Sequence, residues 1–210
     1  FENAQQIDLY TLQLGFRTLE KLTWIEISWL AESPRIVQIP PPKRYGEKST
    51  LAKQLKHLLV NLALVKIGQT GFERIVRFKF SSRPGKEIEK EVIVELMGRH
   101  SNILLLDRSS KVVTLGKQIK ENHSRLRPIG TGDSYKSPPA LKGLAPNLSE
   151  SFQTWKENIC LVPSTFKNCL KDTYQGISPA LTLQIASNNY NEAINIINQS
   201  VTSIELKTWE

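Results

Sequence analysis

The spacing of apolar residues changes once along this chain of 210 residues, and that change limits the folds it can adopt. Up to about residue 115, apolar side chains such as Leu12 and Leu14 recur at every second position, which is the period of a strand with one buried face. After about residue 147 they recur every three to four positions, as in Phe152, Trp155 and Ile159, which is the period of an amphipathic helix. We therefore expect a β-rich part followed by an all-helical part.

Short strands and one helix make up the predicted β-rich part. Three consecutive prolines from Pro40 end a first block of strands, because proline cannot donate to a central ladder. A helix then opens at Ser49, and Leu51 and Leu55 begin its apolar stripe. The strands are predicted over residues 12–17, 23–30, 35–39, 62–68, 74–81, 89–97, 102–106 and 112–115.

Four helices are predicted in the second part, behind a linker that begins at Pro138 and runs to about Pro146. This linker sets the predicted domains at residues 1–146 and 147–210. Asn147, with Glu150 three residues later, has the pattern of a capping box and is the expected start of the first helix. The other helices are expected to begin at Ser164, at Ser178 and after Asn189.

Composition favours an anionic partner and a reducing compartment. The 28 Lys and Arg residues against 20 Asp and Glu residues give a net charge of +8, which bears on association rather than on fold. Cys160 and Cys169 lack the spacing of a zinc site and are too few for a disulfide framework, so we expect free thiols and no metal. No apolar run reaches the roughly 18–20 residues of a membrane span, and residues 1–3 do not resemble a signal peptide. We expect a cytoplasmic protein without a membrane partner, and a chain whose start at Phe1 lies inside a longer gene product or results from processing.

The sequence contains no recognisable motif for catalysis or for a cofactor. It has neither the Gly-x-x-x-x-Gly-Lys phosphate cradle nor a strand-linked Gly-x-Gly-x-x-Gly, and Gly130-Thr131-Gly132 is expected to be a turn. No nucleophile elbow marks a serine for a triad with a histidine. We therefore expect no enzyme activity, no catalytic residue and no cofactor.

A polar patch of unusual composition interrupts two apolar strands at residues 97–102, which read Met-Gly-Arg-His-Ser-Asn. A hairpin turn with a glycine bulge would account for Gly98, but it does not require Arg99 or His100. A guanidinium can hold a phosphate or a base edge, and an imidazole can stack on a base. The patch is therefore either a structural hairpin or an RNA-contacting loop.

A basic segment follows this patch. From Arg108 to Arg127 there are six basic residues and one acidic residue, Glu121. Such a run is often only a solvated face, but its position after the polar patch favours a surface that tracks phosphates and whose binding weakens as salt rises. The predicted phosphate contacts are Arg108, Lys111, Lys117, Arg125 and Arg127.

The run Glu95-Leu-Met-Gly-Arg-His-Ser-Asn102, followed by Ile-Leu-Leu-Leu-Asp, resembles the hallmark of the NFACT family. This family comprises the RqcH-type ribosome quality-control factors of bacteria, which are also called fibronectin-binding protein A-like. Gly132, Tyr135 and Pro138-Pro139 match its Gly-x-x-Tyr-x-x-Pro-Pro loop. Residues 175–179 resemble the opening of its helix-hairpin-helix region, and residues 11–18 are similar to a cyanobacterial-type version.

The resemblance implies an α+β fold in which a mainly antiparallel two-sheet domain with flanking helices precedes an all-helical segment. The two-sheet domain would be related to the N-terminal domain of formamidopyrimidine-type DNA glycosylases. The family binds tRNA beside the split large ribosomal subunit that still holds peptidyl-tRNA, and it recruits alanyl-tRNA for template-free addition of alanine to the stalled chain. Because the ribosome forms the peptide bond, such a module needs no nucleophile.

The resemblance also implies particular site residues. The tRNA-contacting Asp-Arg pair of the family falls on Glu73-Arg74, where Glu73 keeps the charge but reaches further than aspartate. A second tRNA-contacting stretch of the family falls on Glu95, Leu96 and Met97. On chemical grounds we add the neighbouring residues Arg99, His100 and Asn102 as phosphate or base contacts.

Two other functions remain open at this point. The related fold suggests a DNA glycosylase, but those enzymes use the amine of an N-terminal proline, whereas this chain begins with Phe1-Glu2. The older family name suggests a fibronectin-binding adhesin at the cell surface, for which this sequence offers neither a signal peptide nor an anchor.

Overall fold

The structure is a computed structural model that describes residues 1–42, 46, 49–120 and 127–203. The chain forms two compact units. Unit 1 comprises residues 1–70 and 74–138, and unit 2 comprises residues 71–73 and 139–210. No helix in the described part of the chain combines the length and the apolar character needed to cross a membrane.

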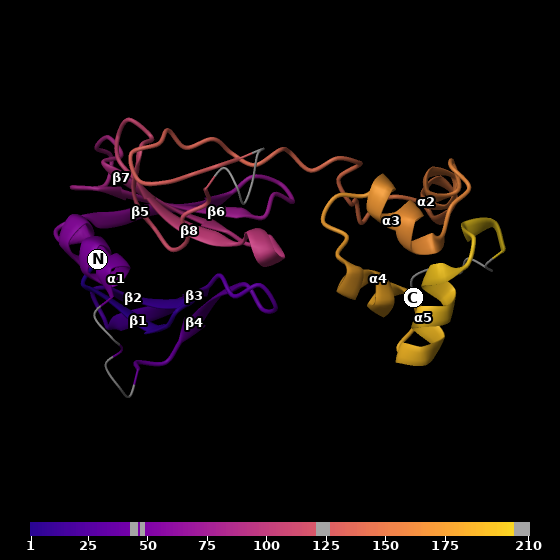
Figure 1. The fold of residues 1–210 in the computed structure, drawn as a ribbon, viewed down its shortest axis with the longest axis horizontal. Helices are drawn as coiled ribbons and strands as arrows, with labels where there is room; N and C mark the ends of the chain where they lie inside the picture. The colour runs from indigo at the N-terminus through magenta and orange to yellow at the C-terminus, as the bar shows by residue number, and fades with distance from the viewer. Residues whose placement is uncertain (43–45, 47–48, 121–126, 204–210) are drawn as a thin grey trace. The chain divides into compact units, whose positions relative to one another are not determined.

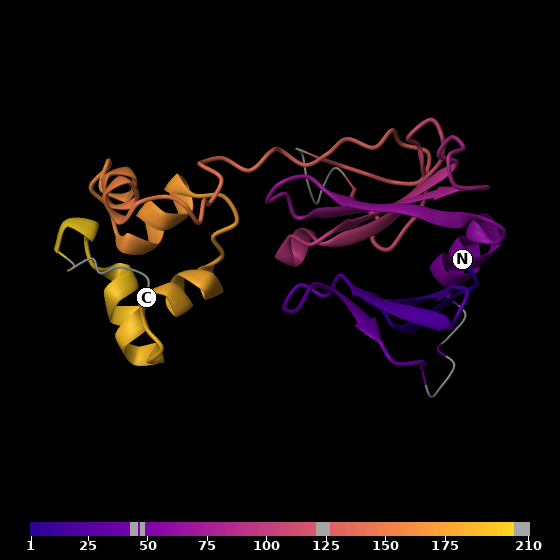
Figure 2. The ribbon, with the colours of Figure 1, turned by 180° about the vertical axis from the view of Figure 1, so that it is seen from behind.

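The described residues of unit 1 form two antiparallel sheets, each with its strands in sequence order, and the α-helix α1 (Thr50–Leu59) lies between the two sheets in the chain. Figure 1 and, from behind, Figure 2 show the sheets as two layers with α1 at one end. The first sheet consists of β1 (Asn3–Asp8), β2 (Thr11–Arg17), β3 (Leu22–Ser28) and β4 (Arg35–Ile39). The second sheet consists of β5 (Ala63–Gln69), β6 (Ile75–Ser81), β7 (Lys90–Glu95), β8 (Asn102–Leu106) and β9 (Val112–Leu115).

The main core lies between the facing sides of the two sheets. Leu14 and Ile27 of the first sheet and Phe78 and Leu105 of the second are almost wholly buried in it, together with Leu55 of α1. Alternation explains the arrangement, because every second side chain of a strand points to the same face. Helix α1 begins where the sequence predicts, since the Ser49 hydroxyl accepts a hydrogen bond from the backbone N–H of Ala52 at 3.0 Å.

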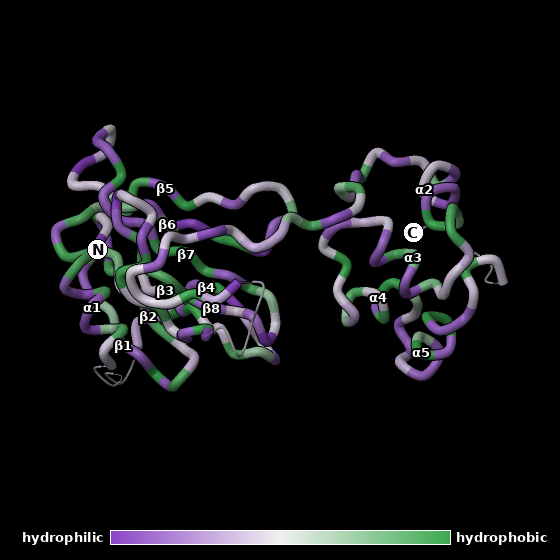
Figure 3. Tube along the Cα trace, turned by 45° about the horizontal axis from the view of Figure 1, so that its top comes forward, coloured by the Kyte–Doolittle hydropathy of each residue, from purple (hydrophilic) through white to green (hydrophobic). Residues whose placement is uncertain are grey.

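The second sheet is covered on its other face as well. Ile75, Ile93 and Leu104 of that face are buried against Ile129, which lies in the segment after β9. As a result all five residues of β8 are buried. A strand covered on both faces carries a continuous apolar run, which is what the sequence Asn-Ile-Leu-Leu-Leu shows. Figure 3 shows such hydrophobic stretches among the hydrophilic ones.

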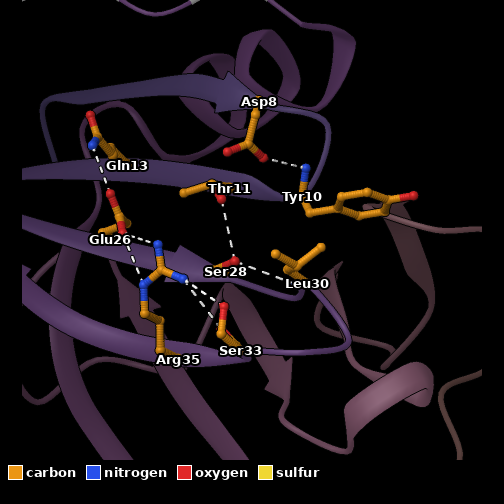
Figure 4. A network of polar contacts seen from close by, with 9 residues as sticks. All are labelled: Asp8, Tyr10, Thr11, Gln13, Glu26, Ser28, Leu30, Ser33 and Arg35. Atoms are coloured by element: carbon orange, nitrogen blue, oxygen red, sulfur yellow. Dashed lines mark hydrogen bonds and ion pairs between the residues drawn. The ribbon is translucent and has the colours of Figure 1, made fainter.

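Polar side chains on the outer face of the first sheet bridge neighbouring strands (Figure 4). The amide of Gln13 donates to the carboxylate of Glu26 at 3.0 Å, and Arg35 forms an ion pair with the same carboxylate at 2.7 Å. Thr11 donates to Ser28 at 3.3 Å on the same face. These cross-strand pairs hold β2, β3 and β4 in register.

Unit 2 is helical and has its own core. Its elements are α2 (Phe152–Ile159), α3 (Phe166–Thr173), α4 (Pro179–Ala186), α5 (Tyr190–Asn198) and the short 3₁₀ helix η2 (Val201–Ser203). Ser178 and Asn189 cap α4 and α5 as predicted. The first two helices begin later than predicted, because Ser151 rather than Asn147 caps α2 and Thr165 rather than Ser164 caps α3. Asn147 instead accepts a hydrogen bond from Ser149 N–H in a turn.

Unit 2 also begins earlier than the predicted boundary at residues 146 and 147. The segment expected to be a linker is tied to α3 and the residues behind it: Leu144 N–H donates to Thr173 O at 2.7 Å, and Gln175 N–H donates to Leu144 O at 2.8 Å. Cys169 is buried and Cys160 is partly exposed, both as free thiols. Burial raises the pKa of Cys169.

Leu105→Ala should lower the free energy of unfolding of unit 1 by about 2–5 kcal/mol, because it removes buried methyl groups and leaves a cavity between the sheets. Chemical denaturation followed by circular dichroism measures the change. Leu19→Ala is the matched control, since Leu19 is fully exposed in the same unit. Equal effects of the two substitutions would contradict the assignment of the core.

Candidate nucleic-acid interface

The loop between β7 and β8 carries the polar patch and is more structured than a bare hairpin turn. Residues Gly98–His100 form a 3₁₀ turn, η1. Gly98 has φ +55°, a left-handed conformation that glycine adopts without strain. The hydroxyl of Ser101 accepts a hydrogen bond from Met97 N–H at 2.8 Å and closes the turn. Arg99 and His100 remain exposed on its outside.

Asn102 does not face solvent but joins this loop to the segment behind β9. It is fully buried, its amide donates to Lys117 O at 2.8 Å, and its carbonyl accepts from Lys117 N–H at 2.9 Å. Gly116, the residue before Lys117, has no room for a side chain, since a Cβ at this position would lie 2.9 Å from the ring of Trp29. Asn102 therefore fixes the backbone of Lys117, and its predicted RNA contact stays a prediction.

Exposed cations gather at this end of the second sheet. The guanidinium of Arg99 donates to the His100 imidazole at 3.1 Å, and the ammonium of Lys117 donates to Arg99 O at 3.4 Å. Arg74 lies at the same end, because its carbonyl accepts from Leu96 N–H at 2.8 Å and β6 pairs with β7 beside it. We call Arg74, Arg99, His100 and Lys117 the basic cluster; all four are exposed.

Glu95 ends β7 next to the basic cluster, but its carboxylate points into the protein. Its side chain is 1% exposed and forms a two-pronged ion pair with Arg127, at 2.9 and 2.5 Å. The hydroxyl of Tyr135 donates to the same carboxylate at 2.9 Å. Each of these two side chains thus uses its charge on the other, and the RNA contacts predicted for Glu95 and Arg127 stay predictions.

Tyr135 lies between two guanidinium groups. The Cζ atom of Arg127 is 5.2 Å from the ring centre, and that of Arg77 is 5.5 Å from it. Arg77 also forms an ion pair with Glu91 at 3.3 Å. Burial and the neighbouring Glu95 carboxylate raise the pKa of Tyr135 far above its usual value, so the hydroxyl keeps its proton and remains a donor to Glu95.

The Glu95 carboxylate also affects the pKa of Arg127. Burial alone would lower the pKa of Arg127, but its hydrogen bonds to Glu95 raise it overall, so the guanidinium stays charged. A further hydrogen bond runs from Arg127 Nε to Lys136 O at 2.7 Å. These contacts hold residues 127–137 against the outer face of the second sheet. Tyr135 comes from the Gly-x-x-Tyr-x-x-Pro-Pro motif, which gave no indication of this role.

The side chains of the other predicted site residues are not part of the basic cluster. Arg108 and Lys111 sit in the turn behind β8, at the opposite end of that strand, and Arg108 forms an exposed ion pair with Glu89 at 3.4 Å. Leu96 packs against the main core, and Met97 is half-buried. Glu73 belongs to unit 2, where its carboxylate accepts from Leu141 N–H at 3.0 Å. Arg125 lies outside the described residues.

Charge divides unevenly between the two units. Unit 1 contains 23 of the 28 Lys and Arg residues and 13 of the 20 Asp and Glu residues, so its net charge is +10. The remaining five basic and seven acidic residues give unit 2 a net charge of −2, and the two values add to the +8 of the chain. An anionic ligand is therefore attracted to unit 1.

Comparison with known families and proteins gives matches over most of the chain. The profile of the NFACT N-terminal and middle domains matches residues 1–208. The Rqc2 homolog RqcH of Bacillus subtilis is 33% identical over 117 residues, which cover 54% of this chain and 20% of that protein. Its counterpart from Streptococcus pneumoniae is 31% identical over 137 residues, 61% of this chain and 25% of that protein. The matched part thus spans a fifth to a quarter of the length of these relatives.

Solved structures share the fold. The N-terminal domain of the fibronectin-binding protein PavA from Streptococcus pneumoniae has a TM-score of 0.69 at 23% identity, covering 86% of this chain and 68% of that one. The fibrinogen-binding protein from Staphylococcus aureus has a TM-score of 0.65 at 20% identity, covering 93% and 71%. At identities this low, the matches show the fold alone. This shared fold confirms the α+β class expected from the sequence.

Tyr135→Phe should lower the free energy of unfolding of unit 1 by about 1–3 kcal/mol, because it removes one donor from a buried carboxylate. Chemical denaturation measures the loss. Tyr10→Phe makes the same chemical change on a ring that is 39% exposed, and it should have an effect below about 0.5 kcal/mol. A similar loss in both variants would show that the hydrogen bond to Glu95 contributes nothing of its own.

Proposed function

Because the chain belongs to the NFACT family, we propose that unit 1 is the tRNA-binding module of an RqcH-type ribosome quality-control factor. In this proposal the whole protein works in the cytoplasm, on a split large ribosomal subunit that still holds peptidyl-tRNA. There it recruits alanyl-tRNA for template-free addition of alanine to the stalled chain. The module itself catalyses no reaction, since its part is to bind and orient the tRNA.

The basic cluster is the observation that carries this proposal. Arg99, His100 and Lys117 are exposed side by side, and Arg74 lies at the same end of the sheet. Lys and Arg at such positions neutralise phosphates and release counterions, which is the main source of affinity for nucleic acid. The planar groups of Arg99 and His100 can also stack on unpaired bases, the usual targets of specific RNA recognition.

The buried groups support the proposal by keeping these cations in place. Asn102 holds the backbone of Lys117 through two hydrogen bonds. Glu95 forms an ion pair with Arg127 within the protein, so this negative charge beside the basic cluster is compensated and does not face a phosphate. A backbone fixed in this way loses little conformational entropy when the surface binds a ligand.

A second candidate is suggested by the names of the proteins that share the fold. Those names describe binding of fibronectin and of fibrinogen. A net charge of +10 on unit 1 would also favour an acidic protein surface. The two functions differ in their ligand, and a direct binding comparison separates them.

Arg99→Ala/Lys117→Ala should weaken binding of fluorescently labelled tRNA about tenfold or more, because two phosphate contacts are lost. The slope of log affinity against log salt should fall by about 1–2 for the same reason. Fluorescence anisotropy across a series of salt concentrations measures both quantities.

Arg83→Ala/Lys86→Ala is the matched control, since it removes the same two charges from the exposed hairpin between β6 and β7. An equal loss in the control would mean that only net charge matters, and unchanged affinity in the first variant would overturn the site. Binding of immobilised fibronectin, without detectable binding of tRNA, would favour the second candidate.

A further inference from the structure

Unit 2 contains a pocket that plays no part in the proposed function. Its volume is about 700 Å³, and its walls come from residues 146–155, from α3 and the residues behind it, and from Phe72. The described wall is largely apolar; Leu170 lies in it, and Phe72 is 44% exposed. The volume lies within the range of pockets that bind small molecules or single side chains.

Aromatic rings dominate the pocket. Phe152 and Trp155 stack with their ring centres 5.9 Å apart and their planes at 26°. Tyr174 and Phe72 add two more rings to the wall. The face of an aromatic ring carries partial negative charge and attracts a cation, most strongly when the ring is tryptophan.

One carboxylate, that of Glu150, lies in the same wall. It accepts a hydrogen bond from the Tyr174 hydroxyl at 2.7 Å and another from the Asn158 amide at 2.8 Å. Both donors are neutral, and within the described residues no Lys or Arg forms an ion pair with Glu150. The pocket therefore combines four aromatic rings with a negative charge that is not paired with any Lys or Arg among the described residues.

We propose that this pocket binds an arginine side chain presented by a protein partner. The guanidinium would stack on Trp155 or Phe152 and donate to the free lone pairs of Glu150, while its aliphatic stem would lie along Leu170. Arginine suits the site better than lysine, because its flat group both stacks and donates two parallel hydrogen bonds to a carboxylate.

The charge of unit 2 argues for a basic protein segment and against nucleic acid. Unit 2 has a net charge of −2, whereas the rest of the chain has +10. A phosphate brought to the pocket would meet Glu150 and be repelled, but a basic peptide would be attracted. This inference does not depend on the tRNA proposal, since none of its residues lies in the basic cluster.

A peptide with a single arginine between leucines, labelled with a fluorophore, provides the test on the full chain. We expect it to bind, and we expect the same peptide with citrulline, which is nearly isosteric but neutral, to bind about tenfold more weakly. Glu150→Gln should reproduce that loss for the arginine peptide. Glu157→Gln is the matched control, because Glu157 is an exposed acid on α2, the helix that follows Glu150.

Trp155→Leu tests the same pocket without touching the carboxylate. It keeps an apolar side chain but removes the ring face, so binding of the arginine peptide should again weaken while the circular dichroism spectrum stays unchanged. Equal affinity for the arginine and citrulline peptides, or full affinity in both Glu150→Gln and Trp155→Leu, would overturn the proposal. The affinity for tRNA should be the same in all three variants, so that a failure here is distinct from a failure of the tRNA site.

Discussion

A carboxylate withdrawn from water must be compensated by hydrogen bonds and by opposite charge, and Glu95 receives both. Three hydrogen bonds, two from Arg127 and one from Tyr135, reach it across more than thirty residues of sequence. If the covering segment left the sheet, Glu95 would lose these partners, and the apolar side chains under the segment, such as Ile93 and Leu104, would be exposed to water. Beside Glu95, at the start of β8, Asn102 fixes the backbone of Lys117 through two further hydrogen bonds.

In this arrangement, the charged side chains that stabilise the fold are separate from those that are exposed to a ligand. Arg77, Arg127 and Glu95 neutralise one another or their neighbours around the ring of Tyr135. Arg99 and His100 stand on a short 3₁₀ turn whose polar backbone is satisfied by Ser101. A run of adjacent residues, from Glu95 to Asn102, thus alternates between structural and exposed roles. Its composition alone does not show which residue has which role.

Local sequence patterns predicted most helices and strands, but they did not predict contacts between residues that are far apart in the sequence. Alternating apolar residues located most strands, and the capping residues Ser49, Ser178 and Asn189 located three helix starts. Strand β1 was missed because its sequence, Asn-Ala-Gln-Gln-Ile-Asp, has almost no apolar alternation and is buried through polar contacts such as the hydrogen bond between Gln5 and Gln13. The partners of Glu95 could not be predicted, because hydrogen bonds over 32 and 40 positions depend on the finished fold.

The unequal net charges of the two units affect how the chain approaches any polyanion. A net charge of +10 on unit 1 accelerates encounter with RNA, while −2 on unit 2 opposes it, so long-range attraction selects unit 1 before short-range contacts form. The screening length at physiological salt is about 8 Å, and attraction beyond it fades. In the proposed function, specificity must then come from the few groups at contact distance, Arg99 and His100 among them, whereas the acidic, aromatic pocket of unit 2 would repel phosphate and attract a cationic partner.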